Sequence, residues 1–225
     1  MVFDNPLFTS QEWPVGARGA AGVWLPLLSL FTGARQSELA GLKASNITED
    51  EATGTPLMFI VSDKKTGRRL KTKPSERVIP IHSQLIELEF LKFVAERRGE
   101  KPDAWLFPLV SPATGRAGIK AWSKWWGKYL RKRVGVTDTN KVFHSFRHGV
   151  QDALRRTTPD EELRDAIQGR SSQKKSVGRG YGAKEMLARW GVETLQEAVS
   201  KISYPGLDLS RVQPFGPVKR NRGGK

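Results

Sequence analysis

The chain has 225 residues, enough for one sizeable domain or two small ones, and it contains no Cys and three His. Disulfides and thiolate chemistry are excluded, and a zinc site is not expected. The formal net charge of +15 is typical of proteins that bind a polyanion. No apolar run approaches the roughly 20 residues that cross a bilayer, and no signal-peptide pattern is visible, so we expect a cytoplasmic protein without a membrane partner.

The first part of the chain predicts a buried helix, and an arginine that follows it, Arg35, is a candidate site residue. Residues 1–19, rich in Pro and Gly, are predicted to be an irregular lead-in, and residues 20–31 a buried helix that Pro26 should end or kink. After a glycine, a new helix starts with Arg35 in its first turn, where a cation opposes the helix dipole. This position suggests an anionic partner, and Glu38 can hold the Arg35 side chain from the same face. A routine surface Arg–Glu pair explains these residues equally well.

Two β-rich runs, 57–61 and 78–81, flank a basic connector and predict a β-hairpin. Seven Lys or Arg lie between residues 64 and 77, and an arm of that charge can follow a phosphate backbone. One lysine at the tip could also serve chemistry, although a charge run is more often a solvated, mobile loop. The cations of the arm that we assign to nucleic-acid contact are Lys64, Lys65, Arg68, Arg69 and Lys73.

The middle of the chain contains two helical patterns. Residues 84–98 carry an apolar stripe at helical spacing. Between residues 119 and 134 an aromatic stripe recurs at the same spacing and is predicted to be core rather than a base-stacking surface. Lys124 and Lys128 lie on the opposite side, where they can meet phosphates. The aromatic residues of the stripe are Trp122, Trp125, Trp126 and Tyr129.

The stretch from Phe143 to His148 crowds two imidazoles and a guanidinium into five positions. If a helix begins near Phe143, His144 and Arg147 project from one face beside the free N–H groups of its first turn. Such an arrangement suits an anion, because it combines the positive end of a helix dipole with a fork of donors. A surface helix with a satisfied histidine is the ordinary alternative, and only the neighbouring motifs favour an anion site.

The C-terminal part begins with a short helix over residues 160–168, for which Thr158 is the predicted N-cap. Gly169 and Arg170 stop this helix, and a glycine-rich turn then presents Tyr181. One or two closing helices follow over residues 184–201. We therefore expect a single domain over residues 20–204, and a flexible basic tail over residues 205–225.

These side chains can act together on one phosphodiester. Attack by a tyrosine oxygen creates a five-coordinate transition state with extra charge on the non-bridging oxygens, which Arg35 and Arg147 can clamp. His144 can accept the tyrosine proton, and a lysine can protonate the leaving 5′ oxygen. The phosphotyrosyl link stores the bond energy, so neither a nucleotide cofactor nor a metal is expected.

At these residues the sequence resembles the tyrosine recombinase (phage integrase) family, over about residues 20–190. The resemblance implies an α+β, mostly α catalytic domain with a small antiparallel three-stranded sheet. It also implies that DNA strands are cleaved and rejoined through a 3′-phosphotyrosine. The matching stretches are Thr32 to Leu39, Lys71 to Pro80 and His144 to His148, with Tyr181 in the setting of the nucleophile.

Carried over residue by residue, the resemblance also implies the catalytic residues and the partners. It implies double-stranded DNA as substrate, self-association on DNA as a synaptic tetramer, and a nucleoid-associated location in a bacterial or phage-infected cell. Lys73 is the alternative to Lys71 as the catalytic lysine. The implied catalytic set is Arg35, Lys71, His144, Arg147, Arg170 and Tyr181.

Two departures from the family pattern stand out. Where the family usually has Gly-His, sometimes Gly-Trp, this chain has Gly169-Arg170. An arginine can donate to a phosphate oxygen but cannot act as a neutral acceptor, so proton handling at Tyr181 is expected to differ. The 34 residues before Arg35 are too few for the N-terminal DNA-clamping domain of the family, so we expect a catalytic fragment or a minimal relative.

Three other hypotheses remain open. A type IB topoisomerase-like enzyme on the same fold would relax supercoils without paired sites. A DNA-binding regulator would keep the basic cleft without turnover, and Arg170 favours it. A general basic nucleic-acid-binding domain would make the motifs a coincidence. A covalent DNA adduct that Tyr181→Phe abolishes separates the enzymes from the binding proteins.

Overall fold

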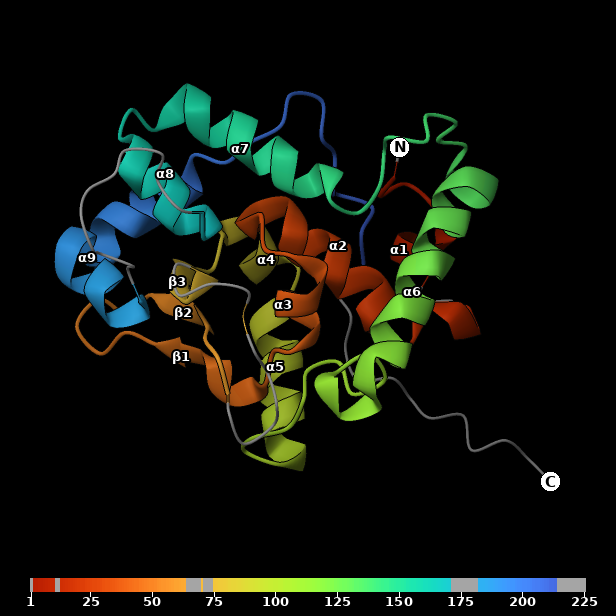
Figure 1. Cartoon of the computed structure of the whole chain (residues 1–225), viewed down its shortest axis with the longest axis horizontal. Coiled ribbons are helices and arrows are strands. Elements are labelled where there is room, and N and C mark those ends of the chain that lie inside the picture. Colours follow the sequence, from red (N-terminus) through yellow and green to blue (C-terminus); the bar gives the residue numbers. More distant parts are fainter. Residues whose placement is uncertain (1, 11–12, 64–69, 71–74, 171–181, 214–225) are drawn as a thin grey trace.

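The computed structural model describes residues 2–10, 13–63, 70, 75–170 and 182–213, and helices dominate this part of the chain (Figure 1). Three short strands form one antiparallel sheet in the order β1-β2-β3. These strands are β1 (Ile47–Glu49), β2 (Pro56–Ile60) and β3 (Arg77–Pro80). The mostly helical α+β class with a small three-stranded sheet is therefore confirmed.

Helices enclose the sheet and build most of the core. None of those described is long and apolar enough to cross a membrane. A turn of π-helix (Leu130–Val134) continues α6. The helices are α1 (Pro6–Thr9), α2 (Ala21–Thr32), α3 (Gln36–Ala40), α4 (Ser83–Glu87), α5 (Phe90–Glu100), α6 (Gly115–Tyr129), α7 (Ser145–Thr157), α8 (Glu161–Gln168) and α9 (Ala183–Ser200).

The sheet contains the expected hairpin and a third strand whose position in the chain was not predicted. β2 and β3 pair with Met58 opposite Ile79, which confirms the two predicted β-rich runs to within one residue at each end. β1, in contrast, was not located from the sequence. It was missed because a three-residue edge strand with only Ile47 buried has no alternation to detect. All four residues of β3 are buried, and both α8 and α9 pack against it.

Helix α2 forms the centre of the core, and all twelve of its side chains are buried. It continues through Pro26 to Thr32, so of the two predicted effects of Pro26, an end or a kink, the end of the helix is wrong. Burial of the whole helix outweighs the cost of one proline. Gly33 ends α2 with a φ of 62° and packs against α7, where an added Cβ would lie 3.2 Å from Val150 Cβ. This close approach joins the end of α2 to α7.

The aromatic stripe of α6 is core, as predicted. Trp122 and Trp126 are fully buried, and Trp122 Nε1 donates to the carbonyl of Ala17 at 3.0 Å. The hydroxyl of Tyr129 donates to Asn5 Oδ1. These contacts tie the N-terminal segment to α6. That segment was expected to be irregular, but it contains α1 and contributes buried apolar side chains to the core, namely Phe3, Leu7 and Phe8.

Two helix boundaries differ from the prediction. The pattern over residues 84–98 folds as two helices, α4 and α5, because the chain turns at Glu89 with a φ of 61°. The N-cap of α8 is Asp160 rather than Thr158, since the Asp160 carboxylate accepts from the backbone N–H of Glu162 at 2.9 Å. A carboxylate satisfies free N–H groups at a helix start more strongly than a hydroxyl does.

The closing segment also departs from expectation. α9 changes direction at Gly191, with φ 70° and ψ 167°, so the alternative of two closing helices applies. Within the expected tail, Leu209 and Val212 are buried, and the N–H of Gln213 donates to the carbonyl of Phe8 at 3.2 Å. Residues 205–213 therefore pack on the domain, and the rest of the tail lies outside the described residues.

Candidate functional site

Arg35 is the N-cap of α3 and is tied to Glu38 one turn later. Its guanidinium Nη1 donates to Glu38 Oε1 at 2.6 Å, and its backbone N–H donates to Oε2 at 2.8 Å. The predicted Arg–Glu pair is therefore present. It is not a routine surface pair, because Glu38 is only 3% exposed.

A second arginine, Arg77, holds the same carboxylate from the opposite side. Its Nη2 donates to Glu38 Oε2 at 2.9 Å, and the side chain is 1% exposed. Burial alone would raise the pKa of Glu38. The charge of Arg77 and hydrogen bonds from Arg77 and Arg35 outweigh burial and lower that pKa to about 2. Glu38 is therefore ionised throughout the physiological pH range.

Arg77 was not predicted to be a site residue, because it is the last of seven cations between residues 64 and 77. The sequence nevertheless contained a signal, namely the position of Arg77 in the strand pattern. Arg77 opens a strand in which Ile79, two positions on, shares its face of the sheet and is buried. A cation on the buried face of a strand requires a partner inside the protein.

Arg147, on α7, is a second buried arginine of the site, and its pKa is strongly lowered. Its side chain is 2% exposed, and its Nη1 donates to the carbonyl of Gly33 at 2.7 Å. Within the described part of the chain, its Nη2 has no hydrogen-bond partner. Burial, followed by the positive charges of Arg35, Arg77 and Arg170, lowers the pKa of Arg147 to about 9, with Glu38 opposing. A buried cation with a spare donor and a surplus of like charge around it favours an anionic ligand.

His144 and Arg170 complete the cluster that the structure describes. His144 is the N-cap of α7, and its ring packs edge-on against His148 with centroids 5.1 Å apart. The pKa of His144 is lowered first by burial of the ring, and then by electrostatic interaction with His148 and with three arginines, Arg147, Arg35 and Arg170. The neutral imidazole is thus favoured at neutral pH. Arg170 follows α8, and its N–H donates to the carbonyl of Asp165 at 2.9 Å.

Four of the predicted catalytic residues therefore come together, and the others cannot be placed. We call Arg35, Arg77, Arg147, Arg170, His144 and Glu38 the arginine cluster. The cluster contains four guanidiniums and one carboxylate, a surplus of three positive charges among its members; Arg35 and Arg77 bond to that carboxylate, and Arg170 also acts on the carboxylate of Asp165. Arg35 Nη2 also approaches the carbonyl of Gly169 at 3.4 Å, which brings the two ends of the site together. The predicted residues that lie outside the described part of the chain are Lys71 and Tyr181, and Lys64, Lys65, Arg68, Arg69 and Lys73.

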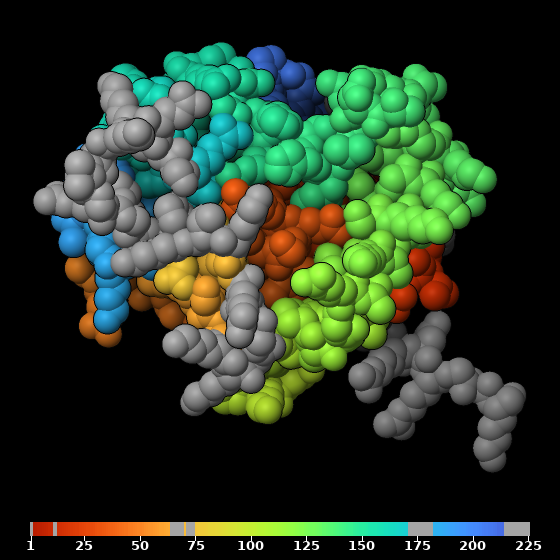
Figure 2. All heavy atoms as spheres, in the orientation of Figure 1, coloured from red at the N-terminus to blue at the C-terminus, as the bar shows by residue number. Residues whose placement is uncertain are grey.

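Helix α6 lies beside the segment that carries Arg35. Lys124 and Lys128 are exposed, opposite the buried tryptophans, as predicted. Gln36, the first residue of α3, donates from Nε2 to the carbonyl of Ile119 at 3.4 Å and so links α3 to α6. Figure 2 shows the resulting face, on which α7 and α6 lie beside the segment that carries Arg35. Nucleic-acid contact by these lysines stays a prediction.

Because the cluster carries surplus positive charge, sulfate is expected to stabilise the fold. At fixed ionic strength, exchanging chloride for sulfate should raise the unfolding temperature in a saturable way, equivalent to about 2.7 kcal/mol when sulfate reaches 100 times its dissociation constant. Arg147→Met should lose this response. Lys92→Gln, which removes an exposed cation on α5, should retain it. A response equal in all three proteins would contradict an anion site at the cluster.

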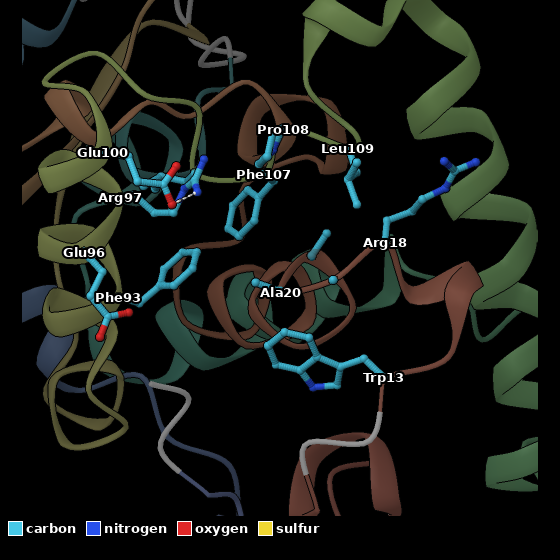
Figure 3. Close-up of a pocket in the computed structure, with 13 residues that line it drawn as sticks. Trp13, Arg18, Ala20, Phe93, Glu96, Arg97, Glu100, Phe107, Pro108 and Leu109 are labelled. Carbon is cyan, nitrogen blue, oxygen red and sulfur yellow. Dashed lines mark hydrogen bonds and ion pairs between the residues drawn. The ribbon is translucent and has the colours of Figure 1, made fainter. Parts of the chain in front are cut away.

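A cavity lies elsewhere in the described part of the chain. It has a volume of about 340 Å³ and is bounded by α5, the start of α2 and the segment around Phe107, with Trp13 and Phe93 among its apolar walls (Figure 3). Arg97 and Glu100 form an ion pair at its edge. No member of the arginine cluster lines it. No group of three or more possible metal-ligating side chains is found in the described ranges.

Comparisons of the chain with protein-family models, with curated proteins and with solved structures found no match. A function must therefore be inferred from the arginine cluster and from the motifs that carry its residues.

Proposed function

We propose that the chain is a tyrosine recombinase-type catalytic domain, a metal-independent transferase that cleaves and rejoins DNA strands through a 3′-phosphotyrosine. One observation carries the proposal. Arg35, Arg77 and Arg170 come from three separate segments and surround the buried guanidinium of Arg147, which has a spare donor within the described part of the chain. Double-stranded DNA as substrate, self-association on DNA and a nucleoid location belong to the same proposal.

The chemistry follows from the charges. In the first step the tyrosine oxygen bonds to phosphorus, the bond to the 5′ oxygen breaks, and the two guanidinium forks of Arg35 and Arg147 balance the charge on the non-bridging oxygens. His144, whose neutral form is favoured first by burial and then by its cationic neighbours, accepts the tyrosine proton. A lysine from the basic arm, Lys71 or Lys73, protonates the leaving 5′ oxygen. In the second step a 5′ hydroxyl attacks the phosphotyrosine and restores the phosphodiester.

The other two tyrosines of the chain are unsuited to be the nucleophile. The hydroxyl of Tyr129 is engaged with Asn5, and that of Tyr204 donates to the carbonyl of Leu30 at 2.5 Å. Burial raises the pKa of both hydroxyls, which disfavours the phenolate. Tyr181 is the remaining candidate among the three. Its neighbour Gly182 is the buried N-cap of α9, and α9 packs against the strand that begins with Arg77.

The proposal predicts a covalent protein–DNA adduct. A pool of duplexes of randomised sequence, each with one nick, is incubated with the protein in the presence of EDTA, and adducts that survive denaturation are collected. Tyr181→Phe is expected to abolish the adduct, because the attacking oxygen is lost. Tyr129→Phe and Tyr204→Phe are matched controls that remove a hydroxyl elsewhere, and both should retain it.

The other outcomes identify the rival functions. DNA binding without an adduct in the parent protein would favour a regulator, which the surplus charge contributed by Arg170 also suits. Adduct formation together with relaxation of a supercoiled plasmid lacking paired sites would favour a topoisomerase-like enzyme.

A further inference from the structure

We propose that Arg77 is a positioning residue for the arginine cluster: it locks Glu38, and through Glu38 the guanidinium of Arg35, against the end of α8. The inference rests on the proposed function, because it concerns the placement of the group that would clamp the phosphate. Arg77 itself is buried and is not expected to touch DNA.

Arg77 joins three parts of the fold with one planar group. Its Nη2 donates to Glu38 on α3, its Nη1 donates to the carbonyl of Ser75 before β3, and its Nε donates to the carbonyl of Ile167 on α8, each at 2.9 Å. The guanidinium presents its donors in a fixed fork, so the three acceptors are held in one mutual geometry. A lysine ammonium cannot reproduce that geometry.

The end of α8 is built closely against this guanidinium. Gly169 has a φ of 63°, and a Cβ added there would lie 2.7 Å from Arg77 Nη1. The same glycine offers its carbonyl to Arg35 Nη2 at 3.4 Å, and Arg170 follows directly. Gln168, one residue earlier, donates from Nε2 to the carbonyl of Arg147 at 3.5 Å. A displaced Arg77 would therefore shift Arg35 relative to both Arg170 and Arg147.

Arg77 also maintains the charge of Glu38. The charged groups that face this carboxylate are Arg35 from the start of α3, Arg77 from β3 and Arg147 from α7. Burial opposes ionisation of Glu38, and Arg77 is the strongest influence in its favour. Without Arg77, Glu38 would bind a proton more readily and would then release the guanidinium of Arg35. If Arg77 has a positioning role, its removal should therefore make the reaction rate depend on the ionisation of Glu38, whereas general destabilisation would not.

The test is a single-turnover rate of adduct formation, measured against pH for the parent, Arg77→Met, Arg77→Lys and Arg77→Met/Glu38→Gln. Arg77→Met should form the adduct tenfold to a hundredfold more slowly with nearly unchanged DNA affinity, the effect of a misplacement of about 1 Å. Its rate should rise with pH as Glu38 ionises, and the double variant should lose that rise. A parental rate in Arg77→Met, or a slower rate with the parental pH profile, would overturn the proposal.

Arg77→Lys keeps a positive charge beside Glu38, so it allows the proposal to be tested even if Arg77→Met does not fold. It should retain the parental pH profile but react about tenfold more slowly, since one ammonium cannot serve all three acceptors. A parental rate in this variant would count against the proposal.

Should the parent form no adduct, the proposed function fails, and sulfate affinity then tests Arg77 by itself. Because Arg77→Lys preserves net charge, a several-fold loss of sulfate affinity supports positioning, and an unchanged affinity overturns it.

Discussion

Glu38→Gln is expected to lower the free energy of unfolding by about 3 to 5 kcal/mol, the usual effect of removing one partner from a buried ion pair. The substitution leaves Arg77 and Arg35 without a counter-charge, and Arg77 is almost fully buried. Urea unfolding of the parent and the variant measures the difference. Glu197→Gln, which removes an exposed carboxylate paired with Lys201, is the control and should change stability little.

The lowered pKa of Glu38 also predicts how the free energy of unfolding depends on pH. The pKa of Glu38 is about 2 in the folded chain, against an ordinary value of 4.5. The unfolded chain therefore binds the proton more tightly. The stabilising contribution of Glu38 is complete above pH 4.5 and is lost as the pH falls from 4.5 toward 2. The parent should lose more stability than Glu38→Gln across this window. Parallel curves would show that Glu38 does not carry the ion pair described here.

Arg147→Met, in contrast to Glu38→Gln, is expected to lose activity while it keeps its stability. Losing one charge-stabilising fork should slow adduct formation by roughly a hundredfold or more. The variant should be at least as stable as the parent, because repulsion from Arg35, Arg77 and Arg170 disappears and offsets the lost bond to Gly33. Adduct assays and urea unfolding of the same preparation measure both effects.

The sign of the stability change is the informative part of this experiment. The pKa of Arg147 is about 9, well below that of an ordinary arginine, so the folded chain holds this charge unfavourably at neutral pH. If Arg147→Met lost as much stability as Glu38→Gln, the charge of Arg147 would be structural. The surplus-charge account of the site would then be wrong.

Local patterns in the sequence predicted much of what builds the site. The hairpin followed from two β-rich runs, and the aromatic side of α6 followed from helical spacing. The motif spacing selected Arg35, His144 and Arg147, which the fold brings into one cluster. Each of these signals depends on residues a few positions apart, which is the range over which strands and helices impose a period.

Features that depend on distant residues were not predicted. Arg77 and Glu38 are 39 positions apart, and nothing local marks them as partners. The N-terminal segment was expected to be irregular. Its ordered structure depends on a distant contact, the hydrogen bond between Asn5 and Tyr129 on α6, which no local pattern reveals. Pro26 was expected to stop a helix that the surrounding core holds together. In each case tertiary packing outweighed the local preference.

The attacking group is tested most directly by mapping the covalent bond. The adduct formed on nicked duplex is digested with nuclease and protease, and the peptide that carries a nucleotide is identified by mass spectrometry. We expect one modified residue, Tyr181, linked through a 3′-phosphate. A nucleotide on Tyr129, Tyr204 or any other side chain, or DNA cut without a protein-linked end, would contradict the account.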